Sequence, residues 1–354
     1  MPIALPLPII SPGQQVCVRV PATSANLGPG FDSLGLALSW YDTLTVEAAA
    51  DDGLEIEIRG AGSDRLPRDA SHLSVRCIDA FLARYQYRRG GLRLIAENSI
   101  PHGRGLGSSA AAIVAASLAA WQLLPEEARP GLDAVFAAAA ALEGHPDNVA
   151  PALHGGLTIS WHNWRGAQEE QEEQDGEHKD EQKSEQSRQY FVSGVPLNQG
   201  RLRAVVAVPE YELATERARS LLPETVAHSL AAANAARAGL LIHALTTDPS
   251  LLLPATRDYL HQDWRAVAMP QSAALLRHWR EAGIAAVISG AGPTVLALVD
   301  GPERVREAIE VAERFLRSAE QRRDETASGQ ERAESLWRVR EIGIEAEGAR
   351  IISA

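Results

Sequence analysis

The sequence predicts about two domains in which helices and strands are mixed. Its 354 residues suffice for a sizeable core, and 45% of them are hydrophobic. Short runs that alternate like strands, such as 16–20 and 54–58, precede long helix-like runs such as 108–124. The second half is organised differently, because two strand-like runs there flank a Gly-Ala-Gly-Pro turn.

The composition disfavours several classes of partner. A net charge of -12 argues against nucleic acid or an anionic membrane as a main partner. The longest strongly apolar run, 110–124, is shorter than the roughly 20 residues that span a bilayer, and the N-terminus lacks the basic start of a signal peptide. Only Cys17 and Cys77 occur, so we expect no disulfide framework, no metal-thiolate cluster and a cytoplasmic location.

The first half is predicted to begin with an extended arm and to continue with alternating strands and helices. Strands are expected at 16–20 (ending at Pro21), 43–47, 54–58, 91–97 and 157–161, helices at 71–87, 108–124 and 132–142, and a turn-rich segment at 144–156. The Asp51-Asp52-Gly53 turn predicts that strands 43–47 and 54–58 form a hairpin.

The second half is predicted to hold longer helices and a closing strand. Strands are expected at 203–208, 284–289, 294–299 and 337–345, helices at 215–222, 227–245, 271–282 and from 303 to about 318, and a polar, mobile tail at 321–334. Between the halves, the highly acidic segment 168–188 has almost no apolar side chains. It predicts a disordered surface insertion, with an acidic partner-binding loop as the alternative.

A glycine-rich stretch, IPHGRGLGSSAAAIVAASL at 100–118, is the main functional signal. Glycines on alternate positions from Gly103 to Gly107 precede Ser108 and Ser109 and an Ala-rich helix. Glycine lets backbone approach a ligand, serine is a favoured N-cap, and a helix start attracts phosphate. The lysine of a Walker A loop is absent. By itself this turn could also be a simple capped connection between a strand and a helix.

As a whole, this stretch resembles the phosphate loop of the GHMP kinases, whose pattern is Pro-x-x-x-Gly-Leu-Gly-Ser-Ser-Ala. Four further segments resemble motifs of the homoserine kinases within that family, in the expected order. They are PATSANLGPGFDSLGLAL at 21–38, HPDNVAPALHGG at 145–156, TERARSLLP at 215–223 and VISGAGPTVLAL at 287–298. The resemblance therefore spans most of the chain, from about 16 to 299.

The resemblance implies an α+β, two-domain GHMP kinase fold. The N-terminal ATP-binding domain, 16–200 after the arm at 1–15, would be of a ribosomal-protein-like type with a left-handed β-α-β unit. The C-terminal domain, 201–354, would be ferredoxin-like. The implied activity is phosphoryl transfer from ATP, with Mg²⁺, to L-homoserine in threonine biosynthesis. A kinase for mevalonate or a methylerythritol derivative, and a nucleotide-binding regulator without turnover, are the alternatives, and the oligomeric state stays open, with a homodimer as one option.

The resemblance also implies which residues bind the nucleotide. The phosphate loop would cradle it through Pro101, His102, Gly103, Arg104, Gly105, Leu106, Gly107, Ser108, Ser109 and Ala110. Glu143 ends a predicted helix, where the helix dipole disfavours a carboxylate by about 0.3–1 kcal/mol. A positive partner should offset this cost, and Mg²⁺ bound by Glu143, by Ser108 or Ser109 and by phosphates would do so. A merely solvated Glu143 is the alternative.

Substrate binding is expected to involve charged and polar groups from four of the motifs. Asn26 and Asp32 offer acceptors to a small amino alcohol, although they could instead be a pair that stabilises a turn. Arg219 and Arg265 carry planar guanidinium groups that suit a carboxylate. The remaining candidates are His145 and Asn148 next to the substrate, Thr215 near the transferred phosphoryl group, and Gly290 in a turn that would help to close the site.

Overall fold

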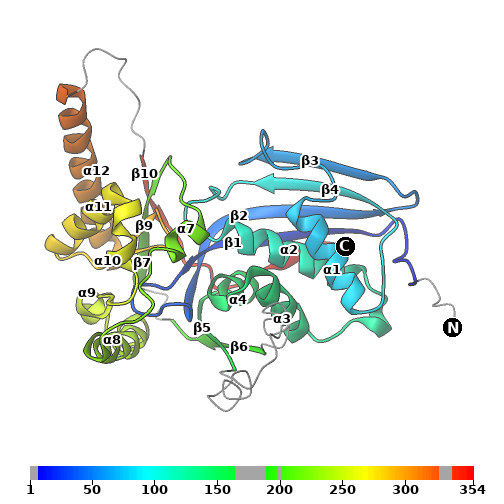
Figure 1. Ribbon diagram of the computed structural model, residues 1–354, viewed down its shortest axis with the longest axis horizontal. Helices are drawn as coiled ribbons and strands as arrows, with labels where there is room; N and C mark the ends of the chain where they lie inside the picture. The colour runs from blue at the N-terminus through cyan, green and yellow to red at the C-terminus, as the bar shows by residue number, and fades with distance from the viewer. Residues whose placement is uncertain (1–6, 164–188, 198–200, 327–336) are drawn as a thin grey trace.

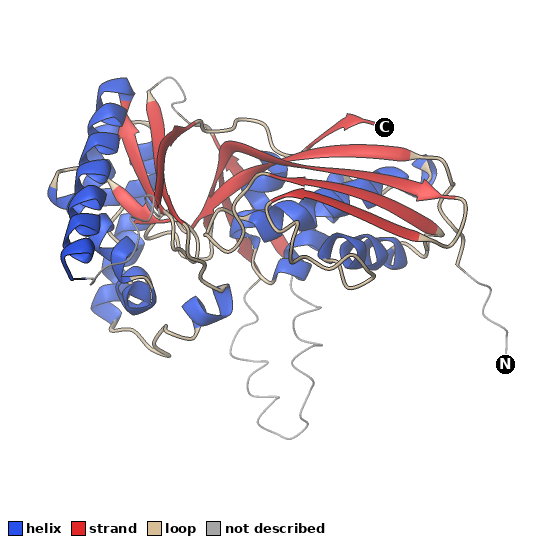
Figure 2. Cartoon of the chain, turned by 90° about the horizontal axis from the view of Figure 1, so that it is seen from above, coloured by secondary structure: helices blue, strands red, loops and turns tan. Residues whose placement is uncertain are grey.

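Two β-sheets form the framework of the computed structural model, which describes residues 7–163, 189–197, 201–326 and 337–354. The sheets follow one another along the long axis of the molecule, and helices pack on each of them (Figures 1 and 2). The predicted insertion at 168–188 lies outside the described residues, as do residues 1–6 of the predicted arm. The predicted domain limits, 16–200 and 201–354, stay predictions.

The first sheet contains seven strands within the described residues. They are β1 (Gln15–Ala25), β2 (Leu34–Ala49), β3 (Leu54–Gly60), β4 (Gly91–Asn98), β5 (Leu157–His162), β6 (Tyr190–Val195) and β11 (Arg350–Ser353). Their order is β11-β1-β2-β4-β3, with β5 paired to β2 and to β6. The helices of this part are α1 (Leu73–Arg84), α2 (Ser108–Leu123), α3 (Leu132–Glu143), α4 (Pro146–His154) and the 3-10 turn η1 (Glu126–Ala128). The parallel strands β3 and β4 are joined through α1 and so form a β-α-β unit.

The second sheet has a ferredoxin-like strand order. Its strands are β7 (Leu202–Pro209), β8 (Ala286–Ile288), β9 (Val295–Asp300) and β10 (Trp337–Ile342), arranged β10-β7-β9-β8 and paired antiparallel. Two helices, α11 (Pro270–Glu281) and α12 (Gly301–Thr326), pack on it with their apolar residues. The intervening helices are α7 (Thr215–Arg219), α8 (His228–Thr246), η2 (Pro249–Leu251), α9 (Leu252–Ala255), α10 (Gln262–Arg265) and η3 (Ala266–Ala268).

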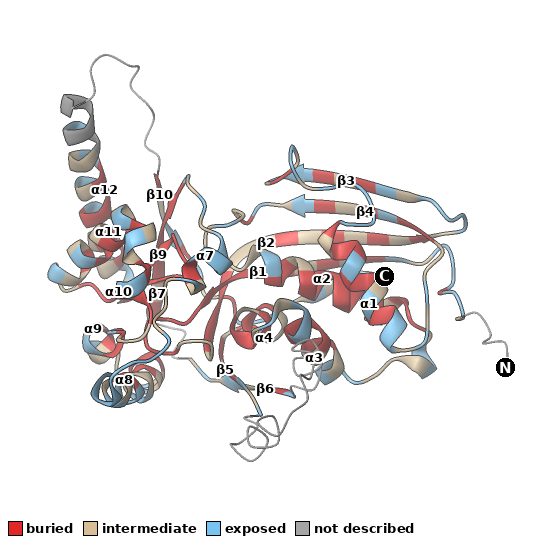
Figure 3. Cartoon of the chain, viewed as in Figure 1, coloured by how far each residue is buried: buried red, intermediate tan, exposed pale blue. Residues whose placement is uncertain are grey.

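Helix α2 lies at the centre of the first core and is buried along most of its length (Figure 3). Its sequence is apolar on nearly every face, which is typical of a helix that is enclosed by other elements. It contacts β1 and β2 on one side and α1, α3 and α4 on the others. The alanines allow this close packing, so the start of α2 is held rigidly against both the sheet and its neighbouring helices.

The predicted hairpin between strands 43–47 and 54–58 is wrong. Strand β4 lies between β2 and β3, antiparallel to β2 and parallel to β3. The turn at Asp51 to Gly53 bonds to the start of β4 instead, where Leu92 N donates to Gly53 O at 2.8 Å. Strand β4 alternates buried and more exposed residues and offers both edges for pairing, so a non-local partner replaces the local one.

Two other boundaries differ from the sequence prediction. Strand β1 continues through Pro21 to Ala25, because the register shifts between Pro21 and Ala22 and such a bulge tolerates a residue without an N–H donor. The segment predicted to be turn-rich contains α4. Pro146 occupies the first turn of this helix, where its missing N–H is not needed, so the residues that resemble a turn begin a helix.

The predicted tail at 321–334 is also partly wrong, since α12 extends to Thr326, and its remainder, 327–334, lies outside the described residues. A run of polar residues continues this helix beyond the predicted end near residue 318. The strand predicted at 43–47 is part of the longer β2, which begins at Leu34. The other predicted helices and strands occur within a few residues of their expected limits. Strands β6 and β11 and the short helices α9 and α10 were not predicted. Among the described residues, none of the helices combines the length and the apolar character needed to cross a membrane.

Candidate active site

The phosphate loop connects β4 to α2 in a backbone conformation that its glycines make accessible. Gly103, Gly105 and Gly107 all have positive φ, between 64° and 73°. Gly107 is the N-cap of α2, and Ser108 is the first helical residue. The expected serine N-cap is therefore wrong, because the cap position requires a left-handed φ of 69° that glycine adopts without strain. Both serine side chains remain available for other contacts.

The turn at Gly290 packs directly against the phosphate loop. Ser289 Oγ donates a hydrogen bond to Gly105 O at 2.6 Å, and Thr294 N donates to Arg104 O at 3.3 Å. A Cβ atom on Gly105 would lie 2.2 Å from Ser289 O, which is far inside van der Waals contact. Glycine at position 105 thus allows the second sheet to approach the loop. The resemblance to the GHMP kinases implied a turn at Gly290 that helps to close the site.

One cavity brings together most of the predicted site residues. It is lined by Asn26, Asp32, Gly103, Gly105, Gly107, Ser108, Ser109, Glu143, His145, Asn148, Thr215, Arg219, Arg265 and Gly290 among others. The other predicted loop residues lie elsewhere: Leu106 and Ala110 are in the core, Pro101 and Arg104 line a neighbouring polar groove, and His102 lines that groove and an apolar pocket. The cavity also contains Asp147, which lies in the same motif as His145 and Asn148.

Glu143 and Ser109 form a side-chain pair at the start of α2. Glu143 is the last residue of α3, which Gly144 ends in the left-handed conformation. Ser109 Oγ donates to Glu143 Oε2 at 2.9 Å. Burial raises the pKa of Glu143, against the effects of His145 and of the Ser109 hydrogen bond. Among the described residues no Lys or Arg forms an ion pair with this carboxylate, so a bound cation would relieve its desolvation.

His145 and Asp147 form a second pair, at the start of α4. The distance from His145 Nδ1 to Asp147 Oδ1 is 2.7 Å, and Asp147 is buried. Burial lowers the pKa of His145, but the hydrogen bond and the charge of Asp147 outweigh burial and raise it. Beside them, Thr23 Oγ1 donates to Asn148 Oδ1 at 2.8 Å. His145 and Asn148, the two residues predicted near the substrate at the start of α4, are therefore each oriented by a neighbouring side chain.

Asn26 is bound to the protein through both ends of its side-chain amide. Its Nδ2 donates to Gly290 O at 2.9 Å, and its Oδ1 accepts from Asp32 N at 3.0 Å. Asn26 and Asp32 both have positive φ, 68° and 54°, so the loop that carries them is tightly curved. One N–H and one lone pair of the amide remain for a ligand. Asn26 therefore stabilises the turn, as the alternative interpretation of the sequence held, and its amide also retains groups that can bind a ligand.

The two arginines of the cavity differ in their partners. Arg219 is held by the carboxylate of Asp32 through two hydrogen bonds. Arg265 is almost fully buried, and its described partners are Gly290 O and His261 Nδ1, with no partner for its Nε. Burial and the nearby charge of Arg219 lower the pKa of Arg265. Among the described residues no carboxylate forms an ion pair with it, although the charges of Asp32, Asp258 and Asp147 act on it from nearby.

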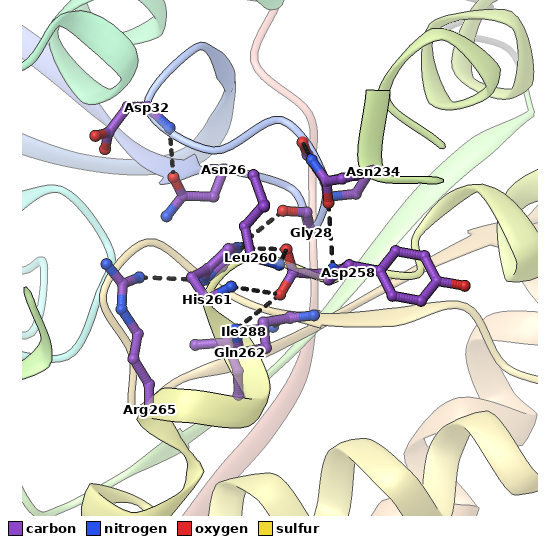
Figure 4. A network of polar contacts seen from close by, with 12 residues as sticks. Asn26, Gly28, Asp32, Asn234, Asp258, Leu260, His261, Gln262, Arg265 and Ile288 are labelled. Carbon is purple, nitrogen blue, oxygen red and sulfur yellow. Dashed lines mark hydrogen bonds and ion pairs between the residues drawn. The ribbon is translucent and has the colours of Figure 1, made fainter. Parts of the chain in front are cut away.

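A network behind Arg265 was missed by the sequence analysis (Figure 4). It contains His261, which touches Arg265, and Asp258, whose carboxylate accepts the backbone N–H groups of Leu260, His261 and Gln262. The only available signal was the position of His261 four residues before Arg265, which places both on one face of a helical turn. His261 also reaches the loop of the first motif, which no sequence pattern indicates.

Comparison with known proteins identifies the family. The model of the GHMP kinases N terminal domain matches residues 72–156, and that of the GHMP kinases C terminal domain matches 241–318. A homoserine kinase of Clavibacter michiganensis is 47% identical over 306 residues, 86% of this chain and 89% of that protein. A homoserine kinase of Streptomyces coelicolor is 49% identical over 286 residues, covering 80% and 84%.

Solved structures give the same result. The crystal structure of homoserine kinase from Cytophaga hutchinsonii superposes with a TM-score of 0.73 at 26% identity, covering 97% of this chain and 98% of that one. The structure of a putative homoserine kinase from Listeria monocytogenes superposes with a TM-score of 0.63 at 28% identity, covering 96% and 100%. The predicted two-domain α+β fold is thereby confirmed, and this chain belongs to the GHMP kinase family.

Proposed function

We propose that this protein transfers the γ-phosphoryl group of ATP to the hydroxyl of L-homoserine, giving O-phospho-L-homoserine and ADP on the route to threonine. One observation carries the proposal: the phosphate loop and the buried guanidinium of Arg265, which has no carboxylate partner among the described residues, line the same cavity. That combination suits a small phosphoryl acceptor that bears a carboxylate. The relatives named homoserine kinases support the same acceptor.

The phosphates of ATP would lie on the phosphate loop. The first turn of α2 has N–H groups without helical partners, and the helix dipole favours negative charge there. An apolar pocket adjoins the loop and shares Ser108 and Ser109 with the cavity. Its lining includes Leu44, Leu66 and Ala111, which fits the flat, largely apolar faces of a nucleobase.

Mg²⁺ fits the oxygen donors at the start of α2. Glu143 supplies a carboxylate that forms no ion pair with Lys or Arg among the described residues, and Ser109 supplies a hydroxyl at hydrogen-bond distance from it. Mg²⁺ commonly uses one or two protein oxygens and completes its coordination with phosphates and water. Glu143, with Ser109 or Ser108, would hold the ion, which would supply charge stabilisation to the transferring phosphoryl group.

The acceptor would be oriented by charged side chains that line the cavity. Arg265 would bind the carboxylate, and Asp32 would accept the ammonium group. His145, Asn148 and Thr215 would lie near the hydroxyl and the transferring group. Phosphoryl transfer depends mainly on positioning and charge stabilisation, so this arrangement requires no dedicated base. A cytoplasmic location and a homodimer stay predictions.

The experiment is to measure ADP release by the purified protein with Mg²⁺, ATP and a panel of alcohols. The panel contains L-homoserine, D-homoserine, L-serine, mevalonate and a methylerythritol derivative. Turnover should be fastest with L-homoserine and absent without an acceptor. A protein that phosphorylates mevalonate but not L-homoserine would retain its family and lose this proposed substrate. A Glu143→Gln preparation made in parallel controls for contaminating kinases.

A further inference from the structure

Arg265 is a buried cation that depends on polar neighbours for its orientation. It is 2% exposed. Its NH1 group donates to Gly290 O at 3.3 Å and to His261 Nδ1 at 3.2 Å, and its guanidinium carbon lies 5.3 Å from the centre of the Phe31 ring. Both acceptors, the carbonyl oxygen of Gly290 and the lone pair of His261 Nδ1, are uncharged. The side chain is therefore held in place while its charge remains available for a ligand.

Three polar neighbours of His261 bear on where its proton lies: Gly28 O, Arg265, and the carboxylate of Asp258, whose Oδ1 is 3.6 Å from Nε2. The ring is fully buried, and Nε2 is 2.8 Å from Gly28 O (Figure 4). A carbonyl oxygen can only accept, so Nε2 carries the proton. The guanidinium of Arg265 can only donate, so Nδ1 must offer its lone pair. A doubly protonated ring would set an N–H against the guanidinium, and burial together with Arg265 lowers the pKa of His261 although Asp258 opposes them.

His261 also connects Arg265 with the loop that carries Asn26 and Asp32. Gly28 belongs to that loop, and the ring of Phe31 stacks on His261 with centroids 5.1 Å apart. Asn26 and Arg265 both donate to the carbonyl oxygen of Gly290. The groups proposed to bind the two charged ends of the substrate are thus coupled through one neutral imidazole and one carbonyl oxygen.

We propose that His261, neutral and with its proton on Nε2, is a positioning residue that orients Arg265 toward the carboxylate of the substrate. This inference rests on the proposed function of the cavity. Asp258 supports it by accepting three backbone N–H groups around His261, at 2.7 to 3.0 Å, which fixes the turn that presents the imidazole. An acceptor without charge orients the guanidinium and leaves its attraction for the carboxylate intact, whereas a carboxylate in the same place would compete with the substrate.

Three substitutions separate the two hydrogen bonds of His261. His261→Asn places an oxygen close to the position of Nδ1 and retains the acceptor toward Arg265. His261→Gln places its amide close to Nε2 and retains the donor toward Gly28. His261→Phe retains the ring and removes both polar atoms. His278→Phe is the matched control, because His278 stacks on Phe315 in the second core, away from the cavity.

The KM for L-homoserine should rise at least about tenfold in His261→Phe and His261→Gln, with kcat and the KM for ATP changing less than about threefold. His261→Asn and His278→Phe should stay within about threefold of the unmodified protein in all three constants. Thermal unfolding of each variant checks that it is folded. His261→Asn also loses the hydrogen bond to Gly28. A KM for L-homoserine near that of the unmodified protein in this variant would therefore identify the hydrogen bond to Arg265 as the one on which substrate binding depends.

Two results would overturn the inference. One is a His261→Asn variant that is folded and as impaired as His261→Phe. The other is a fall in kcat or a rise in the KM for ATP that matches the change for homoserine. Failure of the proposed function has a different signature: the unmodified protein would turn over another carboxylate-bearing alcohol, such as mevalonate, instead of L-homoserine. The same variants would then test the role of His261 on that substrate.

Discussion

The guanidinium of Arg219 donates two hydrogen bonds to the carboxylate of Asp32, at 2.7 and 3.1 Å. Each of these residues was expected from the sequence to bind the substrate, and each is occupied by the other. Their charges compensate one another, so Arg265 is the stronger candidate for the carboxylate of the substrate. The pair also limits how far Asp32 can move when an ammonium group binds.

The two arginines should therefore respond differently to removal. Arg265→Ala is expected to raise the KM for L-homoserine by at least about tenfold more than Arg219→Ala, because only the first change deletes a cation without a carboxylate partner. Steady-state kinetics with both substrates varied would measure this. Arg217→Ala, an exposed neighbour in α7, is the control and should behave as the unmodified protein does. Equal effects of the two substitutions would contradict the assignment.

Breaking the Asp32–Arg219 pair should affect activity more than stability. More than a third of each side chain is exposed, and ion pairs of this kind contribute about 0–1 kcal/mol to folding. Asp32→Asn should consequently change the free energy of unfolding by less than about 1 kcal/mol. It should raise the KM for L-homoserine at least about tenfold through loss of the ammonium partner. A large loss of stability in urea unfolding would instead make Asp32 a structural residue.

Glu143 and Ser109 should act together on Mg²⁺. Glu143→Gln is expected to lower kcat at least about tenfold, which corresponds to about 1.4 kcal/mol of transition-state stabilisation. Ser109→Ala should raise the Mg²⁺ concentration needed for half-maximal activity. Titration of Mg²⁺ at saturating ATP and homoserine would measure both effects. Unchanged kcat in Glu143→Gln at saturating Mg²⁺ would remove this carboxylate from the metal site.

Gly105 offers a test of the contact between the phosphate loop and the second sheet. Gly105→Ala should lower both the stability and the activity, because its Cβ would meet Ser289 O at 2.2 Å and its φ is 73°. Gly283 is the matched control. Its φ is 76°, but a Cβ there would meet no atom within 4 Å, so Gly283→Ala carries only the backbone strain. If the two variants have the same melting temperature and the same kcat, the close approach is unimportant.

Asp42 should give stability a measurable pH dependence. Its Oδ1 accepts the backbone N–H groups of Ser99 and Ile100, at 2.7 and 2.8 Å, immediately before the phosphate loop. Burial raises the pKa of Asp42 from 3.8 to about 6, against these two hydrogen bonds. Folding therefore favours the protonated form of Asp42. The contribution of this group to the free energy of unfolding is complete below pH 3.8 and is lost as the pH rises through about 6.

Asp42→Asn should remove the loss of stability that occurs as the pH rises, since an amide oxygen can accept the same two hydrogen bonds without a charge. Above pH 6 the variant should be more stable than the unmodified protein, by an amount on the order of 3 kcal/mol, and the gain should shrink toward pH 4. Urea unfolding at several pH values would measure it. The exposed Asp52→Asn substitution is the control, with an expected change within about 0.5 kcal/mol at each pH. A gain that does not depend on pH would refute the titration of Asp42.

The sequence predicted features that depend on local patterns. The glycines at 103, 105 and 107 indicated a curved backbone before a helix, and the apolar periodicity indicated α1, α2 and all strands of the two sheets except β6 and β11. The resemblance then placed the residues of distant motifs in one cavity. These inferences succeed because turn conformation and amphipathic burial are properties of neighbouring residues.

Features that depend on distant pairing were not predictable in this way. The insertion of β4 between β2 and β3 follows from competition among strands for partners. The bond between His261 and Gly28 joins positions 233 residues apart, and nothing near either residue indicates it. The Asp32–Arg219 pair was missed for a similar reason: both residues suited the substrate, and only the folded geometry shows that they also suit each other.

The last described strand, β11, completes the edge of the first sheet by pairing with β1, one of the first strands in the chain. During synthesis on the ribosome, the whole second sheet emerges between these two partners. The hydrogen-bonding edge of β1 therefore stays unpaired until residues 350–353 have been synthesised. If synthesis stops before them, that edge is open to pairing with other molecules.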